Sequence, residues 1–441
     1  MTFDFVLRGP TIYSGSDTAV ADIGIVGEKI VAIGDLAGAP CAHVMDCSHL
    51  AALPGLIDTQ VHFREPGMEH KEDLESGSRA AMMGGVTTFF EMPNTSPTTV
   101  NEEALNDKLA RAKGRSWSNY AFFVGATAEN ATELGRLEQL PGTPGIKIFM
   151  GSSTGSLLVP DDDTLRTVLR HARKRCPVHA EDHARLEERK ALLSAQPHPR
   201  EHPHLRDAEC ARMATERLLR IAEEENAKVH VLHVSTADEL PLLAEGRRKG
   251  VCTCEVTPQH LWFAAPDCYD RLGSLAQMNP PVRDDSHRQA LRKALTDGCF
   301  DVIGSDHAPH TLEEKALPYP KSPSGMPGVQ TMLPAFLTLA QRDRLLSVNQ
   351  VVRLGCENPA RIYNIRDKGF IKEGFDADLV LVDLQMPWTF SRDDVESKCG
   401  WSPFEGERFL GKPVHVFVNG MIGVYEGERI GEPAGRVVEF L

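Results

Sequence analysis

The sequence predicts an α/β protein: a (β/α)8, TIM-like barrel with a small β-sandwich-like domain formed by both termini. In the middle of the chain, short apolar runs rich in β-branched residues alternate with stretches of helical periodicity, while both ends read as short strands joined by turns. A length of 441 residues also suits a barrel with a small companion domain better than one compact core.

The alternation occurs eight times. The predicted strands are 56–61, 86–90, 121–124, 146–149, 177–179, 229–234, 251–256 and 300–303. The clearest predicted helices are 71–83, 103–112, 163–173, 208–224 and 236–248. A doubly wound open sheet is the structural rival, but no G-x-G-x-x-G follows the first strand to support it.

The two ends of the chain are β-rich. Strands are predicted at 5–8, 23–26 and 29–33, and again at 377–382 and 414–418. We therefore expect one small β domain assembled from residues 1–52 and 371–441, with the barrel between them at 53–370.

The net charge and the cysteine content limit which partners and which cellular compartment we expect. The formal net charge is −14 and no Lys/Arg-rich run is present, which argues against nucleic acid or an anionic membrane as a partner. The N-terminus lacks a secretory pattern, no apolar run is long enough to span a bilayer, and the ten cysteines are scattered. We expect a cytoplasmic protein with reduced thiols that acts on a small-molecule substrate. We also expect a homo-oligomer, namely a dimer.

Polar side chains interrupt the predicted strands where each strand ends. Barrel enzymes carry their catalytic groups at the carboxyl ends of the strands, so these side chains should meet at one mouth. Three imidazoles and a carboxylate are the ligand types that suit zinc and its neighbours. They are His62, His179, His233 and Asp306. Other histidines lie in polar stretches and are expected to be solvated: His70, His183, His198, His202 and His204.

Several motifs carry a resemblance that spans nearly the whole chain. They are P-G-L-I-D (54–58), H-F-R-E-P-G (62–67), M-P-N-T (92–95), M-N-P-P-V-R (278–283), S-D-H-A-P-H (305–310), N-P-A-R (358–361) and G-F-D-A-D-L (374–379). With these motifs the chain resembles the metal-dependent amidohydrolase superfamily and, within it, the class I dihydroorotases. The resemblance implies zinc, one or two ions per chain.

The resemblance also implies the role of each metal-site residue. His62 would bind the first metal, and His179 and His233 the second. Lys147 matches a lysine that CO₂ carboxylates to a carbamate bridging two metals. Asp306 would bind metal and act as general base, moving a proton from water to the leaving ring nitrogen. Independently of the resemblance, an ammonium cannot sit beside a divalent cation, so Lys147 is either modified or points away.

A second set of residues matches the positions that hold the substrate carboxylate and ring. They are Arg64, Asn94, Asn279 and His310, and Pro327 and Gly328 match a loop whose backbone contacts substrate. Arg64 suits the task because guanidinium and carboxylate pair through two hydrogen bonds. Each residue also has a plain structural interpretation: a salt bridge at the barrel rim for Arg64, and turns for the asparagines and the Pro-Gly pair.

One position departs from the family pattern. The family has His-x-His at the end of the first strand, whereas this chain has Gln60-Val61-His62. A neutral amide oxygen is a poorer zinc ligand than imidazole. The first metal could bind weakly, the site could hold one ion, or the chain could be a non-catalytic partner of a transcarbamoylase.

We favour a working enzyme, because the general base, the other ligands and the carboxylate-binding residues are all retained. The resemblance implies reversible hydrolysis of dihydroorotate to N-carbamoyl-aspartate in pyrimidine biosynthesis. Hydantoinase and allantoinase activities remain the alternatives within the superfamily.

Overall fold

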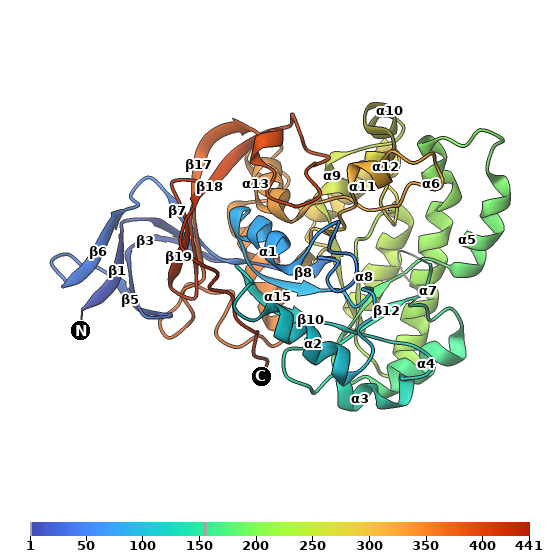
Figure 1. Ribbon diagram of the computed structural model, residues 1–441, viewed down its shortest axis with the longest axis horizontal. Helices are drawn as coiled ribbons and strands as arrows, with labels where there is room; N and C mark the ends of the chain where they lie inside the picture. The colour runs from blue at the N-terminus through green and yellow to red at the C-terminus, as the bar shows by residue number, and fades with distance from the viewer. Residues whose placement is uncertain (1, 153–156) are drawn as a thin grey trace.

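The computed structural model describes residues 2–152 and 157–441. Figure 1 shows a β-rich unit on one side, built from the blue N-terminal and the red C-terminal parts of the chain, and a larger α/β unit on the other. The predicted fold class is confirmed. Within the described ranges, no helix combines the length and apolar character that crossing a bilayer requires.

Parallel strands form the barrel. They are β8 (Leu56–Val61), β9 (Val86–Glu91), β10 (Asn119–Phe122), β11 (Val124–Gly125), β12 (Ile146–Phe149), β13 (Cys176–His179), β14 (Val229–Val231), β15 (Cys252–Val256) and β16 (Val302–Ile303). Neighbours pair in the order β10-β9-β8 and β11-β12-β13-β14-β15-β16.

The third barrel position is split, which the sequence did not predict. β10 pairs with β9 and β11 with β12, while Phe123 between them donates its backbone N–H to the Glu91 carbonyl at 3.0 Å. The barrel closes between its first and last strands, where the His62 N–H donates to the His307 carbonyl at 2.7 Å. When β10 and β11 are counted as one position, the barrel has eight strand positions, as predicted.

Helices follow most barrel strands. The longer ones are α1 (Leu74–Met83), α2 (Glu102–Ala112), α4 (Asp162–His171), α7 (Ala208–Glu224), α8 (Leu240–Arg248), α11 (Asp285–Thr296) and α13 (Met332–Gln341). The shorter ones are α3 (Leu134–Leu137), α5 (His183–Arg189), α6 (His202–Leu205), α9 (Pro258–Trp262), α10 (Asp267–Leu272), α12 (Leu312–Lys315), α14 (Val348–Val352) and α15 (Asn358–Ile362).

Side-chain carboxylates and amides set the starts of several helices. The side chains of Asp73, Asn101, Asp161 and Asp207 each accept a hydrogen bond from the backbone N–H three residues on. The helix predicted from residue 71 therefore begins at Leu74, because Asp73 is its N-cap. The helix predicted over 208–224 is confirmed at both ends.

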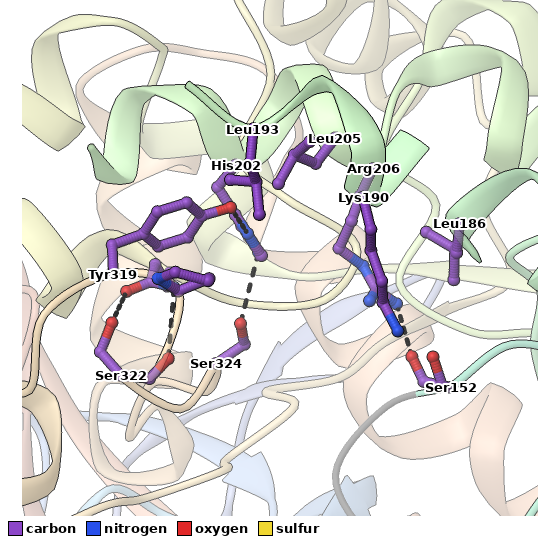
Figure 2. Close-up of a pocket in the computed structure, with 12 residues that line it drawn as sticks. Ser152, Leu186, Lys190, Leu193, His202, Leu205, Arg206, Tyr319, Ser322 and Ser324 are labelled. Atoms are coloured by element: carbon purple, nitrogen blue, oxygen red, sulfur yellow. Dashed lines mark hydrogen bonds between the residues drawn. The ribbon is translucent and has the colours of Figure 1, made fainter. Parts of the chain in front are cut away.

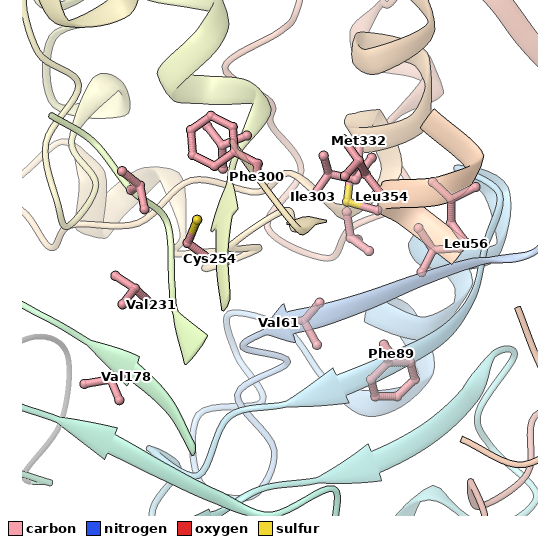
Figure 3. Close-up of a cluster of buried hydrophobic side chains, with 14 of the residues drawn as sticks. Leu56, Val61, Phe89, Val178, Val231, Cys254, Phe300, Ile303, Met332 and Leu354 are labelled. Atoms are coloured by element: carbon pink, nitrogen blue, oxygen red, sulfur yellow. The ribbon is translucent and has the colours of Figure 1, made fainter. Parts of the chain in front are cut away.

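Alternation along the strands separates the core from the site. Val61, Phe89, Val178 and Val231 are fully buried and belong to the main hydrophobic cluster, which also includes side chains from the covering helices (Figure 3). Because successive side chains on a strand point to opposite faces, the residues next to these four side chains face the barrel interior. Packing of these apolar side chains against the helices thus leaves the neighbouring polar side chains facing the barrel interior.

The small β domain combines both chain ends. Its sheets have the orders β5-β4-β1-β6 and β20-β19-β18-β17-β7-β2-β3. The strands are β1 (Phe3–Arg8), β2 (Thr11–Tyr13), β3 (Thr18–Val20), β4 (Asp22–Val26), β5 (Lys29–Gly34), β6 (Cys41–Asp46), β7 (Ala51–Pro54), β17 (Leu379–Thr389), β18 (Arg408–Val418), β19 (Met421–Tyr425) and β20 (Glu428–Arg429). The predicted boundary at 52/53 falls inside β7, and the extent of each domain stays a prediction.

A buried charge cluster joins the small β domain to the barrel. The Lys368 ammonium lies 2.8 Å from carboxylates of both Asp376 and Asp378 and donates to the Asn419 side chain at 3.1 Å. Asp378 also accepts from the side chain of Asn119 on β10. Since Lys368 is only 6% exposed, removing it would leave two carboxylates in a poorly solvated position.

We expect Lys368→Met to lower the free energy of unfolding by about 3–5 kcal/mol, because breaking a buried ion cluster strands its acidic partners. Urea denaturation followed by circular dichroism measures the change. Lys372→Met, at an exposed position four residues away, serves as the control and should change stability by less than about 1 kcal/mol. Equal effects of the two substitutions would contradict a structural role for the cluster.

Candidate active site

A small pocket at the carboxyl ends of the barrel strands collects most of the predicted site residues. Its lining comprises Gln60, His62, Arg64, Asn94, Phe149, His179, His233, Asn279, Asp306, Ala308, Ser324 and Gly325. The pocket encloses about 20 Å³. The structure therefore brings together side chains from the first, second, fourth, fifth, sixth and eighth barrel positions.

Asp306 lies at the centre of the first group of polar contacts. Its Oδ1 accepts a hydrogen bond from Gln60 Nε2 at 3.0 Å and lies 3.4 Å from His62 Nε2. His62 Nδ1 is 2.8 Å from Asn94 Oδ1, so the ring carries its proton on Nδ1. Burial raises the pKa of Asp306 to about 7 and holds the pKa of His62 well below its usual value.

His179 and His233 form the second group. His179 Nδ1 lies 3.0 Å from His233 Nε2, and His179 Nε2 donates to Glu181 Oε2 at 2.9 Å. Glu181 is in turn held by the Arg206 guanidinium, whose Nε is 3.1 Å from both carboxylate oxygens. Burial alone would raise the pKa of Glu181, but Arg206 and His179 hold it well below its usual range. Glu181 therefore sets the tautomer and orientation of His179.

Lys147 is the unusual cation of the site. Its side chain is 1% exposed, its Nζ has no hydrogen-bond partner among the described residues, and it lies 4.5 Å from the centre of the Phe149 ring. Burial lowers the pKa of Lys147 to about 7, against the opposing effect of Asp306 and Glu255. A large fraction of this amine is neutral near pH 7, which is the form that reacts with an electrophile such as CO₂.

Backbone strain is concentrated at these strand ends. Arg64, His233 and Asp306 have positive φ angles of 68°, 38° and 45°. Residues with a Cβ rarely adopt this conformation, and it persists where surrounding packing enforces it, often at functional sites. The three positions turn their side chains into the pocket instead of continuing the strand alternation.

The donor atoms suit a divalent cation. The unprotonated Nε2 of His62 faces Asp306 Oδ1, and the unprotonated Nδ1 of His179 faces His233 Nε2. The contact between His62 and Asp306 joins two acceptors and requires a shared proton or a cation between them, while the ring of His233 can donate to His179. Imidazole with carboxylate is a set that first-row transition metals prefer. Among the described residues no three His, Cys, Asp or Glu side chains form a metal cluster by themselves. Lys147 and Gln60 are the remaining candidate donors here.

Arg64 presents a buried positive charge beside this donor set. Its guanidinium is 1% exposed, donates to the Pro309 carbonyl at 3.1 Å and lies 3.3 Å from His310 Nε2. No carboxylate of the described residues forms an ion pair with it, and burial lowers the pKa of Arg64 to about 10. The rim salt bridge considered for Arg64 is thus not found in the described part of the chain.

Only some of the other residues predicted to bind substrate line the pocket. Asn94 and Asn279 line the pocket, whereas His310 lies behind Arg64 and is fully buried. Pro327 and Gly328 do not line it: they border a separate small cavity, and the Gly328 N–H donates to His307 Nδ1 at 3.1 Å. Ser324 and Gly325 line the pocket where Pro327 and Gly328 were expected.

Two features were missed or misjudged from the sequence. Glu181 was not singled out, although a carboxylate two residues beyond a strand-end histidine is the signal that could have identified it. His202 was expected to be solvated, and this was wrong. It is 5% exposed and its Nε2 lies 3.0 Å from Asn279 Oδ1, because α6 places the ring against Met278, Asn279 and Tyr319.

Known proteins resemble the chain along nearly its whole length. It is 37% identical over 428 residues to a dihydroorotase of Halobacterium salinarum, covering 96% of this chain and 97% of that one. It is 31% identical to an allantoinase of Deinococcus radiodurans, covering 99% of both. Among solved structures, an L-hydantoinase (dihydropyrimidinase) from Arthrobacter aurescens superposes with a TM-score of 0.94 at 27% identity, covering 99% of both chains.

The family model for the amidohydrolase family matches residues 51–423. This match, together with relatives above 30% identity, implies a hydrolase that acts on cyclic amide bonds with a metal cofactor. The strand-end histidines, the buried aspartate and the full-length similarity agree, and the chain belongs to the amidohydrolase family.

Proposed function

We propose that this chain is a metal-dependent dihydroorotase, which interconverts dihydroorotate and N-carbamoyl-aspartate in pyrimidine biosynthesis. The observation that carries the proposal is the Arg64 guanidinium: buried, without a carboxylate partner among the described residues, and facing the pocket that holds Asp306 and the histidines. A buried cation of this kind is stabilised by an anionic ligand, and both proposed substrates carry a carboxylate.

The residues divide the chemistry between them. A divalent metal held at the pocket would polarise the amide carbonyl and activate water. Arg64 binds the substrate carboxylate, while Asn94 and Asn279 orient the ring. Asp306 removes a proton from the attacking water and returns it to the ring nitrogen as the amide bond breaks. Burial raises the pKa of Asp306 above that of an ordinary carboxyl group, which favours uptake of the proton from water.

We propose that zinc is the metal and that one ion binds per chain. His179, His233 and Asp306 would hold it, with Lys147 as a carbamate formed from CO₂. The support for a single ion is Gln60, whose amide N–H group donates to Asp306 where the family has a histidine ligand. The Nε2 group that faces Asp306 cannot coordinate a cation, and the Gln60 Oε1 atom, which has no partner among the described residues, is a poorer zinc ligand than imidazole. In this proposal Gln60 stabilises the aspartate in place of a second metal.

The metal content tests this directly. Protein purified with zinc and bicarbonate should contain about one ion per chain by mass spectrometry of the metal, because the carbamate of Lys147 would complete one donor set with His179, His233 and Asp306. Gln60→His should raise the content towards two, and His179→Ala should lower it well below one. Two ions in the unsubstituted protein would contradict the proposed role of Gln60.

Glu181→Ala should weaken zinc binding by about 10- to 100-fold, since the carboxylate that orients His179 is lost. Competition with a chromophoric chelator measures the affinity. Glu187→Ala, on the exposed side of α5, is the matched control and should leave the affinity unchanged. Loss of zinc in both variants would indicate a general disturbance of this segment instead.

Arg64→Ala should raise the KM for dihydroorotate by about 10- to 100-fold with a smaller change in kcat, because a charge-assisted contact to the bound carboxylate is lost. Steady-state hydrolysis assays of the zinc-loaded enzyme check this, with the exposed Arg136→Ala as control. Absence of dihydroorotate turnover with a filled metal site would refute the proposal. If function in the cell also survived Asp306→Ala, the non-catalytic partner role would take its place.

We also propose where the protein is located, which class of ligand it binds and how it assembles. A cytoplasmic location is supported by ten cysteines that are all free. The net charge of −14 supports a small-molecule substrate without nucleic-acid binding. A dimer is proposed as the oligomeric state, and sedimentation velocity would measure it.

A further inference from the structure

The loop 319–325 lies between the catalytic pocket and a wider cavity of about 340 Å³. Ser324 lines both spaces, Gly325 lines the catalytic pocket, and Tyr319 lines the wider cavity. Figure 2 shows this loop facing the helical segment that carries His202, whose ring contacts Ser324 and Tyr319. The position of the loop therefore sets one side of the catalytic pocket.

A second segment, 277–279, lies against this loop. The Gly325 N–H donates to the Gln277 carbonyl at 2.8 Å, and the Ser322 hydroxyl donates to Gln277 Oε1 at 2.7 Å. Two residues further on, Asn279 lines the catalytic pocket. The two segments thus form one wall of the pocket, although Gln277 and Ser322 are 45 residues apart in the chain.

A single buried cation contacts both segments. Lys315 is the last residue of α12 and is 2% exposed. Its Nζ donates to the backbone carbonyls of Gln277 at 3.3 Å, Pro323 at 2.9 Å and Gly325 at 3.1 Å. These acceptors use all three N–H donors of an ammonium. Since hydrogen bonds from a charged donor are stronger than those between neutral groups, Lys315 holds the loop firmly against the segment 277–279.

Gly325 shows how closely the loop approaches the pocket. Its φ is 149°, and a Cβ there would lie 2.2 Å from the backbone oxygen of Ala308, which also lines the pocket. The same Cβ would lie 3.0 Å from His310 Cδ2. The loop is already packed against the strand-end segment, so a loop released by Lys315 moves outward and widens the pocket.

Lys315 keeps its position without a counter-ion. No carboxylate of the described residues lies within 4.0 Å of its Nζ, and the centre of the Trp401 ring is 5.7 Å away. Burial, together with the Arg64 guanidinium, lowers the pKa of Lys315 to about 7. A neutral amine has two N–H donors and a lone pair that repels a carbonyl oxygen. Loss of the proton would therefore break one of the three contacts.

The other titratable groups around the loop keep their charge near neutral pH. His310 Nε2 lies 3.1 Å from the Ser324 carbonyl, and burial lowers the pKa of His310 to about 3. Burial raises the pKa of Tyr319. In α12, a hydrogen bond with His310 holds the pKa of the Glu314 carboxyl well below its usual range. Among these neighbours of the loop, Lys315 is the group whose charge changes near neutral pH.

We infer that Lys315 is a positioning residue of the substrate site. Its ammonium holds the loop 319–325 against the segment 277–279 and so sets where Asn279, Ser324 and Gly325 lie at the pocket. Its hydrogen bonds go to the wall and not to the proposed metal ligands, so it acts on substrate binding and leaves metal binding unchanged. The inference rests on the proposed function in that a substrate ring binds against this wall.

Hydrogen–deuterium exchange of the zinc-loaded enzyme, read by mass spectrometry, tests the contact itself. Lys315→Met removes the donors and keeps an unbranched side chain. We expect peptides covering 319–326 and 274–280 to exchange about 10-fold faster, because charge-assisted hydrogen bonds are lost, while α7 exchanges at an unchanged rate. Lys321→Met, at an exposed position of the same loop, is the matched control and should leave all three regions unchanged.

Steady-state assays separate a positioning role from a purely structural one. Lys315→Met should raise the KM for dihydroorotate by about 10-fold, change kcat by less than about 3-fold and keep the zinc content of the unsubstituted enzyme. Faster exchange of the wall with an unchanged KM would overturn the positioning role. Unchanged exchange in a folded Lys315→Met protein would overturn the contact as well.

The unsubstituted enzyme provides a test that does not depend on the folding of a variant. After correction for the ordinary pH dependence of amide exchange, exchange of 319–326 relative to α7 should rise between about pH 6 and about pH 8.5, as Lys315 loses its proton. If the melting curve shows that Lys315→Met does not fold, a constant ratio overturns the inference. If dihydroorotate is not turned over, the proposed function fails, and the exchange data alone decide whether Lys315 holds the wall.

Discussion

Exclusion of water at the carboxyl end of the barrel is the constraint on which the site depends. Asp306, Lys147 and the site histidines are almost fully buried, and burial disfavours the charged form of each. The pKa of the carboxyl rises to about 7, the pKa of the amine falls to about 7, and the imidazoles stay neutral. Near neutral pH the site thus holds a carboxyl group and an amine that are each partly uncharged, together with neutral imidazoles.

The same exclusion of water gives Gln60 and Arg64 their importance. Gln60 stabilises the Asp306 carboxylate by a hydrogen bond at the position where the family pattern has a histidine, and the proposal of a single metal ion rests on this side chain. Arg64 is buried and has no carboxylate partner in the described ranges. In the proposed function, the carboxylate of the substrate pairs with it. One residue bears on the cofactor and the other on the substrate.

Two neighbouring cavities lie at the carboxyl end of the barrel. The catalytic pocket is narrow and polar, and the adjoining cavity is wide and apolar with its hydrogen bonds satisfied. His202 and Asn279 link them through a direct contact.

The sequence by itself determined the strand–helix alternation, the β-rich ends and the strand-end residues His62, Lys147, His179, His233 and Asp306, because these follow from local periodicity and from motifs along the chain. Only the tertiary structure decided that β10 and β11 share one barrel position, that Glu181 orients His179, that His202 is buried, and that Ser324 instead of Gly328 faces the pocket. Each of these depends on contacts between segments far apart in sequence, which local patterns do not encode.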